Sequence, residues 1–508
     1  MEKRVRVRFA PSPTGGLHLG GVRTVLYNYL FAKQHGGDFI LRIEDTDQSR
    51  FVAGAEQYIY DTLSWCGLEP DESPKKGGAH GPYKQSERKE TYRKYAEQLV
   101  AEGHAYYAFD TAEELEEMRT KLRSEENPTP QYDRTVRMQM RNSMTLPAAE
   151  VEQLLASAQP HVIRIKMREG EQVSFTDMIR GEVQFDTSLS DDKVLLKGDG
   201  MPTYHLAVVV DDHLMQITHA FRGEEWLPSA PVHVLLWRYL FGEEAMPKWA
   251  HLPLILGPTG KLSKRDGAKY GFPVFAMNWT NQETGEITEG FRERGFLPEA
   301  FVNMLALLGW NDGTDEELFT LQDLVERFSI TKVHKGGAKF DFDKAKWFNH
   351  EWIKKTDSAN LLPYAIKSLE AKGIFPNNDR GLEEIVSLVK DRCTFLSDFY
   401  EHTVYFFKAP DTLDSASVKP KWNEAKESFF ENFIGELESL PEWSAAFIEN
   451  GFKTIASICN IKPGELQLPF RIMLVGGKFG PPVFDIAALI GKEETVRRIR
   501  FALPHFKD

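Results

Sequence analysis

The sequence has few cysteines and no long run of apolar residues. Only Cys66, Cys393 and Cys459 occur among 508 residues, with no spacing typical of a disulfide framework or a zinc site. We expect each to be a small buried apolar residue and expect no protein-bound metal. No run of about 18 apolar residues occurs, and the first ten residues, MEKRVRVRFA, lack the apolar core of a signal peptide. These absences predict a cytoplasmic protein with no membrane segment.

The chain also lacks an excess of positive charge. Its 62 Lys and Arg residues stand against 75 Asp and Glu residues, for a net charge of −13. This argues against a nonspecific polyanion binder but leaves room for a local basic surface. The hydrophobic fraction of 42 % and the charged fraction of 27 % are those of an ordinary globular enzyme. At this length we expect three or four structural units.

Alternating strand and helix patterns predict an α/β fold at the start of the chain. RVRVRFA is typical of a strand, residues 19–30 place apolar side chains at helical spacing, Gly36-Gly37 ends the helix, and FILRIED is the next strand. Such alternation predicts a parallel, doubly wound sheet that binds ligands at the carboxyl ends of its strands. DKVLLK and HLAVVVDDH are predicted as further strands, the second buried on both faces.

The middle of the chain changes character, and its last third is helical. An acidic helix pattern (TAEELEEMRTKL) and short strand patterns (HVIRIKM, GEVQFD) predict an α+β insertion, and Thr320 to Asp323 resembles a capping box. From FDFDKAKWFNHEWI to EETVRRIRFAL the periodicity is helical. The predicted parts are the Rossmann-type sheet domain at 1–103 and 196–256, the insertion at 104–195, a linking region at 257–340 and an α-helical domain at 341–508.

Two loops carry the strongest chemical signal. RFAPSPTGGLHLGG joins the first strand to the first helix, where glycines and a helix N-terminus favour an anion, and His18 can donate to phosphate oxygens. The loop matches neither GxGxxG nor GxxxxGK[ST]. Far downstream, GPTGKLSKRDGA offers Lys261, Lys264 and Arg265 as movable positive charges. Either loop alone is more often structural; together they predict a site for the phosphates of a nucleotide.

The two loops resemble the HIGH and KMSKS motifs of class I aminoacyl-tRNA synthetases. In this order and spacing, RFAPSPTGGLHLGG, LRIEDTD, GPYKQSER, VLLKGDGMPTYHLAVVVDDH, FRGEEW and KLSKR resemble bacterial-type glutamyl-tRNA synthetases. The resemblance implies ATP-dependent ligation of L-glutamate to the 3'-terminal adenosine of tRNA(Glu) through a glutamyl-adenylate, with release of AMP and diphosphate. It also implies ATP with Mg²⁺ as the substrate complex and tRNA(Glu), ATP and L-glutamate as partners. We expect a monomer.

The resemblance also assigns individual residues. The catalytic residues would be His18, Lys261 and Lys264. ATP would bind Ser12, Thr14, Gly15, His18, Gly20, Glu225, Trp226, Ile255, Lys261, Ser263 and Lys264. Glutamate would bind Arg8, Ala10, Ser12, Glu44, Tyr204 and Arg222. Because an arginine facing the neutral amide of glutamine would stay uncompensated, Arg222 would reject glutamine as well as bind glutamate.

Three departures from the family pattern qualify these assignments. Gly21 stands where HIGH has its second histidine, as is common in glutamyl enzymes, and this moves phosphate contacts onto His18 and the backbone amides. Val208 stands where some relatives have an asparagine near glutamate, so that contact is not carried over. AYYAFD lacks the cysteine and histidine ligands with which some relatives bind zinc in the insertion, so we predict no zinc.

On the RNA side, the insertion at 104–195 would bind the acceptor end, the region at 257–340 would contact the stem and carry the KMSKS-like loop, and the helical domain would bind the anticodon. Within that domain the resemblance assigns Arg392, Arg471 and Phe484 to anticodon recognition. KVHKGGAKFDFDKAKW adds lysines that could follow phosphates. Two alternatives stay open: a non-discriminating enzyme that also charges tRNA(Gln), and a catalytically inactive tRNA-binding paralogue. A third alternative, a shortened paralogue that glutamylates a modified tRNA base, is disfavoured, because such paralogues lack the C-terminal helical part that this chain has.

Overall fold

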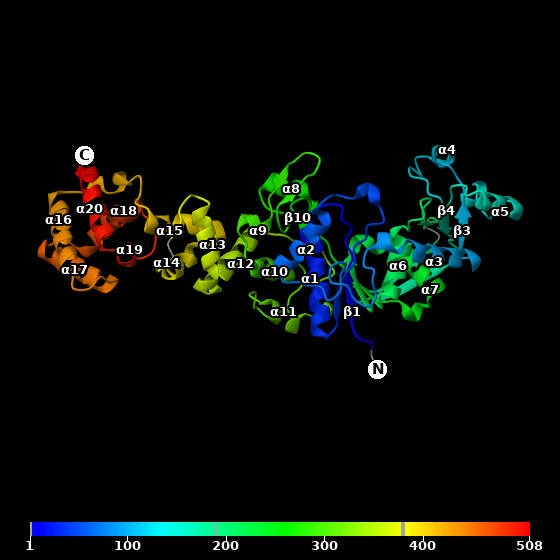
Figure 1. The fold of residues 1–508 in the computed structure, drawn as a ribbon, viewed down its shortest axis with the longest axis horizontal. Helices are drawn as coiled ribbons and strands as arrows, with labels where there is room; N and C mark the ends of the chain where they lie inside the picture. The colour runs from blue at the N-terminus through cyan, green and yellow to red at the C-terminus, as the bar shows by residue number, and fades with distance from the viewer. Residues whose placement is uncertain (1–2, 188–189, 377–380, 508) are drawn as a thin grey trace. The chain divides into compact units, whose positions relative to one another are not determined.

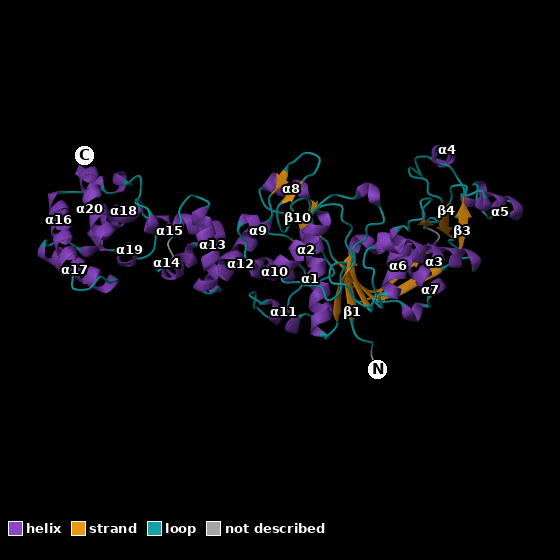
Figure 2. Ribbon diagram, viewed as in Figure 1, coloured by secondary structure: helices purple, strands orange, loops and turns teal. Residues whose placement is uncertain are grey.

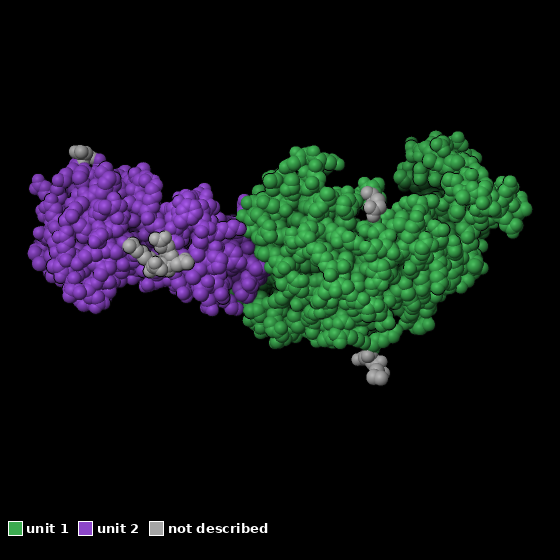
Figure 3. Space-filling view, viewed as in Figure 1, with its two compact units in different colours: residues 1–293, 301–342 green, residues 294–300, 343–508 purple. Residues whose placement is uncertain are grey.

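A computed structural model describes residues 3–187, 190–376 and 381–507. The chain forms two compact units, coloured separately in Figure 3. Unit 1 comprises Met1–Glu293 and Phe301–Phe342, and unit 2 comprises Arg294–Ala300 and Asp343–Asp508. Among the described residues, no helix is long and apolar enough to cross a membrane.

Unit 1 is built around a six-stranded sheet (Figure 2). In spatial order its strands are β2 (Asp38–Leu41), β1 (Arg6–Phe9), β8 (His219–Gly223), β9 (Lys248–Leu252), β5 (Gln172–Asp177) and β6 (Gly181–Asp186). All neighbours pair in parallel except β5 and β6, which form an antiparallel edge. The chain leaves β1 toward β2 on one side and returns as β8 on the other, so the order reverses at β1. The predicted α/β fold with a parallel sheet is therefore confirmed.

Helix α1 (Leu19–Gln34) follows the glycine-rich loop, as the sequence pattern predicts, and packs on β1, β2 and β8. It ends where Gly36 takes a left-handed conformation, with φ of 59°. Figure 1 shows α1 beside the strands that it covers. This strand, loop and helix carry the first predicted motif.

The segment HLAVVVDDH forms a helix, so the prediction of a buried strand was wrong. Helix α6 (Tyr204–Leu214) contains these residues and packs against α3 (Lys89–Ala101) and α7 (Ala230–Leu240). Residues 206–210 are all buried, because helices cover several sides of α6. A short apolar run suits either a buried strand or a buried helix, and only its neighbours decide between them.

The insertion differs in its sheet partners from the sequence prediction. Strands β3 (Ala105–Ala108), β4 (Val162–Ile165) and β7 (Val194–Leu196) form a separate antiparallel sheet, beside α4 (Ala112–Leu122) and α5 (Ala148–Ala156). DKVLLK is thus a strand, but it pairs with β4 and not with the main sheet. Conversely, β5 and β6 lie within the predicted insertion range, yet β5 bonds to β9. Strand pairing depends on tertiary contacts that a four-residue pattern does not encode.

The linking region carries small elements and short helices. Residues 252–256 (LPLIL) span the end of β9 and the start of β10 (Ile255–Gly257). Strand β10 forms a second small sheet with β11 (Gly260–Lys261) and β14 (Ala338–Lys339). The predicted capping box at Thr320 and Asp323 is present at the start of α11 (Leu321–Arg327). The other elements are α2 (Ala55–Trp65), α8 (Lys264–Tyr270), β12 (Trp279–Thr280), β13 (Ile287–Thr288), α9 (Phe291–Arg294) and α10 (Pro298–Ala306).

The rest of the chain is mostly helical, as predicted. Its helices are α12 (Phe342–Lys355), α13 (Ser358–Glu370), α14 (Leu382–Val389), α15 (Phe399–Phe407), α16 (Glu424–Ser439), α17 (Ala445–Ile458), α18 (Pro463–Val475), α19 (Val483–Ile490) and α20 (Lys492–Lys507). Phenylalanine rings from α16, α17, α18 and α19 pack edge to face in a common core. Cys66 and Cys393 are buried, as expected, whereas Cys459 is partly exposed.

Candidate functional site

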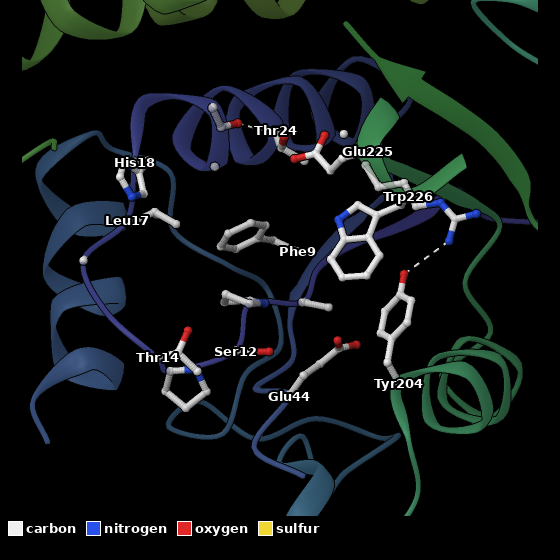
Figure 4. Close-up of a pocket in the computed structure, with 18 of the residues that line it drawn as sticks. Phe9, Ser12, Thr14, Leu17, His18, Thr24, Glu44, Tyr204, Glu225 and Trp226 are labelled. Carbon is white, nitrogen blue, oxygen red and sulfur yellow. Dashed lines mark hydrogen bonds between the residues drawn. The ribbon is translucent and has the colours of Figure 1, made fainter. Parts of the chain in front are cut away.

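A cavity of about 1190 Å³ lies at the carboxyl ends of β1, β2 and β8 in unit 1 (Figure 4). This is where the strand order reverses, the usual ligand position in a doubly wound sheet. All residues predicted to bind ATP or glutamate line the cavity except Gly15, whose neighbours Thr14 and Gly16 do so. The fold therefore gathers the sequence motifs around one space.

The glycine-rich loop brings His18 to the N-terminus of α1, where it takes the N-cap position with an extended backbone. Gly16 has no room for a side chain, because a Cβ there would lie 2.9 Å from ring atoms of Phe275 and Trp279. The His18 ring lies 4.6 Å from the Phe275 ring, centroid to centroid. Burial, and then the charges of Lys264 and Lys261, lower the pKa of His18 to about 4. His18 is therefore a neutral hydrogen-bond donor near pH 7.

The lysine loop faces the same cavity. The ammonium of Lys261 lies 3.2 Å from Glu225 and is largely exposed, so it is free to move. Lys264 opens helix α8 and lies 5.0 Å from the Phe275 ring centroid. Ser263 caps this helix, and its hydroxyl donates to Asp266 at 2.7 Å. Ser263 thus fixes where α8 begins and, with it, where Lys264 stands.

A network of buried charges adjoins the cavity through Arg8 and Glu44, which line it. Arg8 donates to both carboxylate oxygens of Asp212 at 3.1 Å, and Arg42 donates to Asp212 at 2.8 Å and to Glu44 at 3.1 Å. Arg88 pairs with Asp211 at 2.8 Å. Burial raises the pKa of Glu44, whereas Arg8 and Arg42 outweigh burial and hold the pKa of Asp212 below its usual value.

Sequence reasoning missed most of this network. Arg42 and Glu44 follow β2, and Asp211 and Asp212 end the apolar run of α6. Charged residues directly beside a buried run were the available signal, because buried charges need partners. Arg8, predicted as a cation for glutamate, lines the cavity while already paired with Asp212.

Arg222 has a different environment from Arg8, which is paired with Asp212. Its Nε donates to Nε2 of His251 at 2.9 Å, and its Nη1 donates to Nδ1 of His233 at 3.0 Å and to the Tyr204 hydroxyl at 3.3 Å. The dashed line to Tyr204 in Figure 4 marks the last of these bonds. Its guanidinium carbon lies 4.7 Å from the Trp249 ring centroid.

The second terminal nitrogen of Arg222, Nη2, is buried and has no hydrogen-bond partner in the described part of the chain. Arg222 is only 6 % exposed, yet no carboxylate among the described residues lies at ion-pair distance from its guanidinium. A buried guanidinium without an anion is costly. Arg222 therefore presents an unmatched positive charge at the cavity that it lines.

An apolar wall adjoins these charges. Trp226 is 42 % exposed and its ring lies 4.5 Å from that of Tyr204. Ile255 is buried, and its carbonyl accepts the N–H of Leu262 at 2.9 Å, which fixes the start of the lysine loop. Among the described residues no group of three or more His, Cys, Asp or Glu side chains is arranged to hold a metal ion.

The three residues predicted for anticodon recognition have different surroundings in unit 2. Arg392 is exposed, and Nη1 of Arg471 donates to the carbonyls of Phe479, Gly480 and Pro481 at 3.2, 3.1 and 2.5 Å. Burial, and then the charge of Arg392, lower the pKa of Arg471, so the two guanidinium groups lie near each other.

Phe484 is mostly buried. Its ring is 7 % exposed and packs 5.2 Å from the Phe452 ring, within the aromatic core of the helices. In this structure Phe484 therefore belongs to the core of the helices, and its role in base stacking stays a prediction. Phe479 is 51 % exposed and lies beside Arg471. The sequence offered no signal that would have singled it out as an exposed aromatic side chain, because it lies in a glycine-rich loop without helical periodicity.

A parallel α/β sheet with an anion-binding loop and a lysine loop on one cavity defines a nucleotide-binding catalytic domain. Residues 4–347 match the family described as "tRNA synthetases class I (E and Q), catalytic domain". Residues 343–503 match the family described as "Anticodon binding domain". The chain belongs to the class I tRNA synthetases (E and Q), as the sequence resemblance indicated.

Full-length relatives narrow the comparison within this family. The chain is 52 % identical to "Glutamate--tRNA ligase" of Flavobacterium johnsoniae over 99 % of both chains. It is 50 % identical to the protein of the same name from Amoebophilus asiaticus, over 99 % of this chain and 98 % of the relative. A crystal structure of a glutamate tRNA ligase from Elizabethkingia meningosepticum, in complex with its amino acid, matches with a TM-score of 0.94 and 45 % identity, over 99 % of this chain and 100 % of that one.

Proposed function

We propose that this chain ligates L-glutamate to the 3'-terminal adenosine of tRNA(Glu), through a glutamyl-adenylate, with release of AMP and diphosphate. Family membership and the full-length relatives named for this reaction support the activity. The observation that carries the choice of amino acid is Arg222, a buried guanidinium whose Nη2 has no partner among the described residues.

The balance of charge in the cavity favours glutamate over glutamine. Three arginines and three carboxylates of the buried network beside the cavity cancel one another: Arg8, Arg42, Arg88, Glu44, Asp211 and Asp212. Arg222 then adds one positive charge. Glutamate carries a net charge of −1 and neutralises it, whereas zwitterionic glutamine leaves a buried charge unpaired. Glu44 receives the substrate ammonium, and Arg8, Ala10, Ser12 and Tyr204 complete the amino-acid pocket.

The phosphates of ATP bind against the Ser12 to Gly20 loop and the N-terminus of α1. No enzyme nucleophile is required, since the glutamate α-carboxylate attacks the α-phosphorus and diphosphate leaves. His18 donates an N–H from a neutral imidazole to the α-phosphate, while Lys261 and Lys264 neutralise charge on the leaving diphosphate. Lys261 must release Glu225 to do so. Ile255, Glu225 and Trp226 border the nucleoside.

Magnesium enters with ATP as part of the substrate complex. The chain acts as a cytoplasmic monomer, in the compartment that holds its tRNA substrate. For the tRNA, residues 104–195 hold the acceptor end, 257–340 contact the stem, and 341–508 bind the anticodon through Arg392 and Arg471. Arg392 supports discrimination against tRNA(Gln), because an exposed guanidinium can reach a base edge.

Aminoacylation of purified tRNA(Glu) and tRNA(Gln) with labelled glutamate tests this proposal. We expect glutamyl-tRNA(Glu) and no glutamyl-tRNA(Gln), with no charging by labelled glutamine. Charging of neither tRNA would refute the enzymatic activity and favour the inactive paralogue. Charging of both would refute strict discrimination and leave a non-discriminating enzyme.

A further inference from the structure

Two histidines, and not carboxylates, hold Arg222 in place. Its Nε donates to Nε2 of His251 at 2.9 Å and its Nη1 donates to Nδ1 of His233 at 3.0 Å. Arginine has donors only, so both imidazole nitrogens must be lone-pair acceptors. Each ring therefore carries its proton on the other nitrogen and is neutral.

Partners behind the two rings fix these tautomers. Nδ1 of His251 donates to Asp177 at 2.6 Å, and Nε2 of His233 donates to Nδ1 of His205 at 3.2 Å. Asp177 is buried and also accepts the backbone N–H groups of His251, Ile179 and Arg180. His251 thus stands between the Asp177 carboxylate and the guanidinium, so Arg222 has no direct ion pair with Asp177.

We propose that His233 and His251 are specificity-determining positioning residues, which as neutral acceptors orient Arg222 while leaving its charge to the side-chain carboxylate of glutamate. This inference rests on the proposed role of Arg222 in binding glutamate. A carboxylate at either place would pair with Arg222 and remove the net positive charge of the pocket. The pocket would then match the neutral side chain of glutamine better than that of glutamate.

Substitution of His233 by two side chains of nearly equal size tests the inference. His233→Gln keeps a neutral acceptor for Arg222, and His233→Glu supplies a charged one. We measure KM for glutamate, KM for ATP, kcat and the charging of tRNA(Glu) by glutamine. We expect KM for glutamate to rise about 3- to 10-fold in His233→Gln and at least about 100-fold in His233→Glu. KM for ATP should change less than about threefold in both.

The ratio of glutamine to glutamate charging should rise in His233→Glu alone, a change that general damage to the fold would not produce. The matched pair His35→Gln and His35→Glu controls for a new carboxylate, because Nδ1 of His35 faces the Phe31 carbonyl, not an arginine. If His233→Glu does not fold, His233→Asn and His233→Asp provide the same contrast with smaller side chains.

Equal effects of the neutral and charged variants on KM for glutamate would overturn the inference. The inference would also be overturned if His233→Gln raised KM for glutamate as much as Arg222→Ala does. Failure of the unsubstituted protein to use glutamate would instead refute the proposed function, so the two failures are distinguishable.

Discussion

Replacement of Arg222 by alanine should damage glutamate use far more than ATP use. The side chain is buried, and the two N–H groups of its unpartnered Nη2 can donate two charge-assisted hydrogen bonds to a carboxylate, since Nη1 already donates to His233 and Tyr204. At about 1.5 to 3 kcal/mol each, with part of the gain offset by desolvation of the substrate, their loss amounts to about 4 kcal/mol. This corresponds to a rise in KM for glutamate of about 10³-fold.

Arg222→Lys serves as the matched variant. It keeps the positive charge but loses the planar fork that bonds to His251, His233 and Tyr204. We therefore expect an intermediate rise in KM for glutamate, about 10- to 100-fold. Initial rates of aminoacylation, with tRNA(Glu) present throughout and glutamate and ATP varied separately, give both constants. KM for ATP should stay within about threefold of the unsubstituted value, because the phosphate-binding loops lie on other elements.

Thermal unfolding of each variant checks that the fold is retained, since Arg222→Ala leaves two buried imidazole nitrogens and the Tyr204 hydroxyl without their donor. A value of KM for glutamate within about fivefold of the unsubstituted protein in Arg222→Ala would refute the reasoning. Equal rises in the two Michaelis constants would also refute it, because they would indicate collapse of the cavity and not loss of one charge.

Three further predictions concern other parts of the chain. His18→Gln should lower kcat about 10²- to 10³-fold. The pKa of His18 is about 4 in the folded protein and 6.5 in the unfolded chain, so protonation of His18 should lower the free energy of unfolding by about 2 kcal/mol as pH falls from 7.5 to 5. Thermal unfolding of His18→Gln at the two pH values should not show this loss of stability. Phe484→Ala should lower the free energy of unfolding of unit 2 by about 3 to 5 kcal/mol, and a variant as stable as the unsubstituted protein would contradict the place of Phe484 in the core. Arg392→Ala should instead leave the melting temperature unchanged and alter charging of tRNA(Glu) relative to tRNA(Gln). Burial raises the pKa of the Cys66 thiol, so a thiol reagent should label Cys459 before Cys66 in the native protein, and the reverse order by mass spectrometry would contradict the fold around Cys66.

The first strand, loop and helix could be predicted because their signals are local. Apolar spacing along α1, glycines that end it and the capping box at Thr320 each act within a few residues. The lysine loop was likewise visible as an unusual run of basic residues between glycines. The candidate ATP site could therefore be assembled from two short motifs, and the fold places both on one cavity.

The sequence predictions that differ from the structure do so for a common physical reason. Residues 206–210 are all apolar and buried because α6 packs against α3, α7 and β7, and nothing within the segment distinguishes that environment from the middle of a sheet. The partners of β5 and β7 are likewise set by segments far away in the sequence. Phe484 matched a family position, but its exposure depends on the packing of four helices.

The sequence by itself determined the class of fold, the family and the residue types that can hold an acidic amino acid beside ATP, because these depend on local pattern and on side-chain chemistry. Only the tertiary structure decided which charges remain available. Arg8 and Arg222 look alike in the sequence, yet Arg8 is paired with Asp212 while Arg222 meets two neutral imidazoles. Whether a charge is cancelled or kept depends on which groups fold within about 4 Å of it, and those groups come from distant parts of the chain.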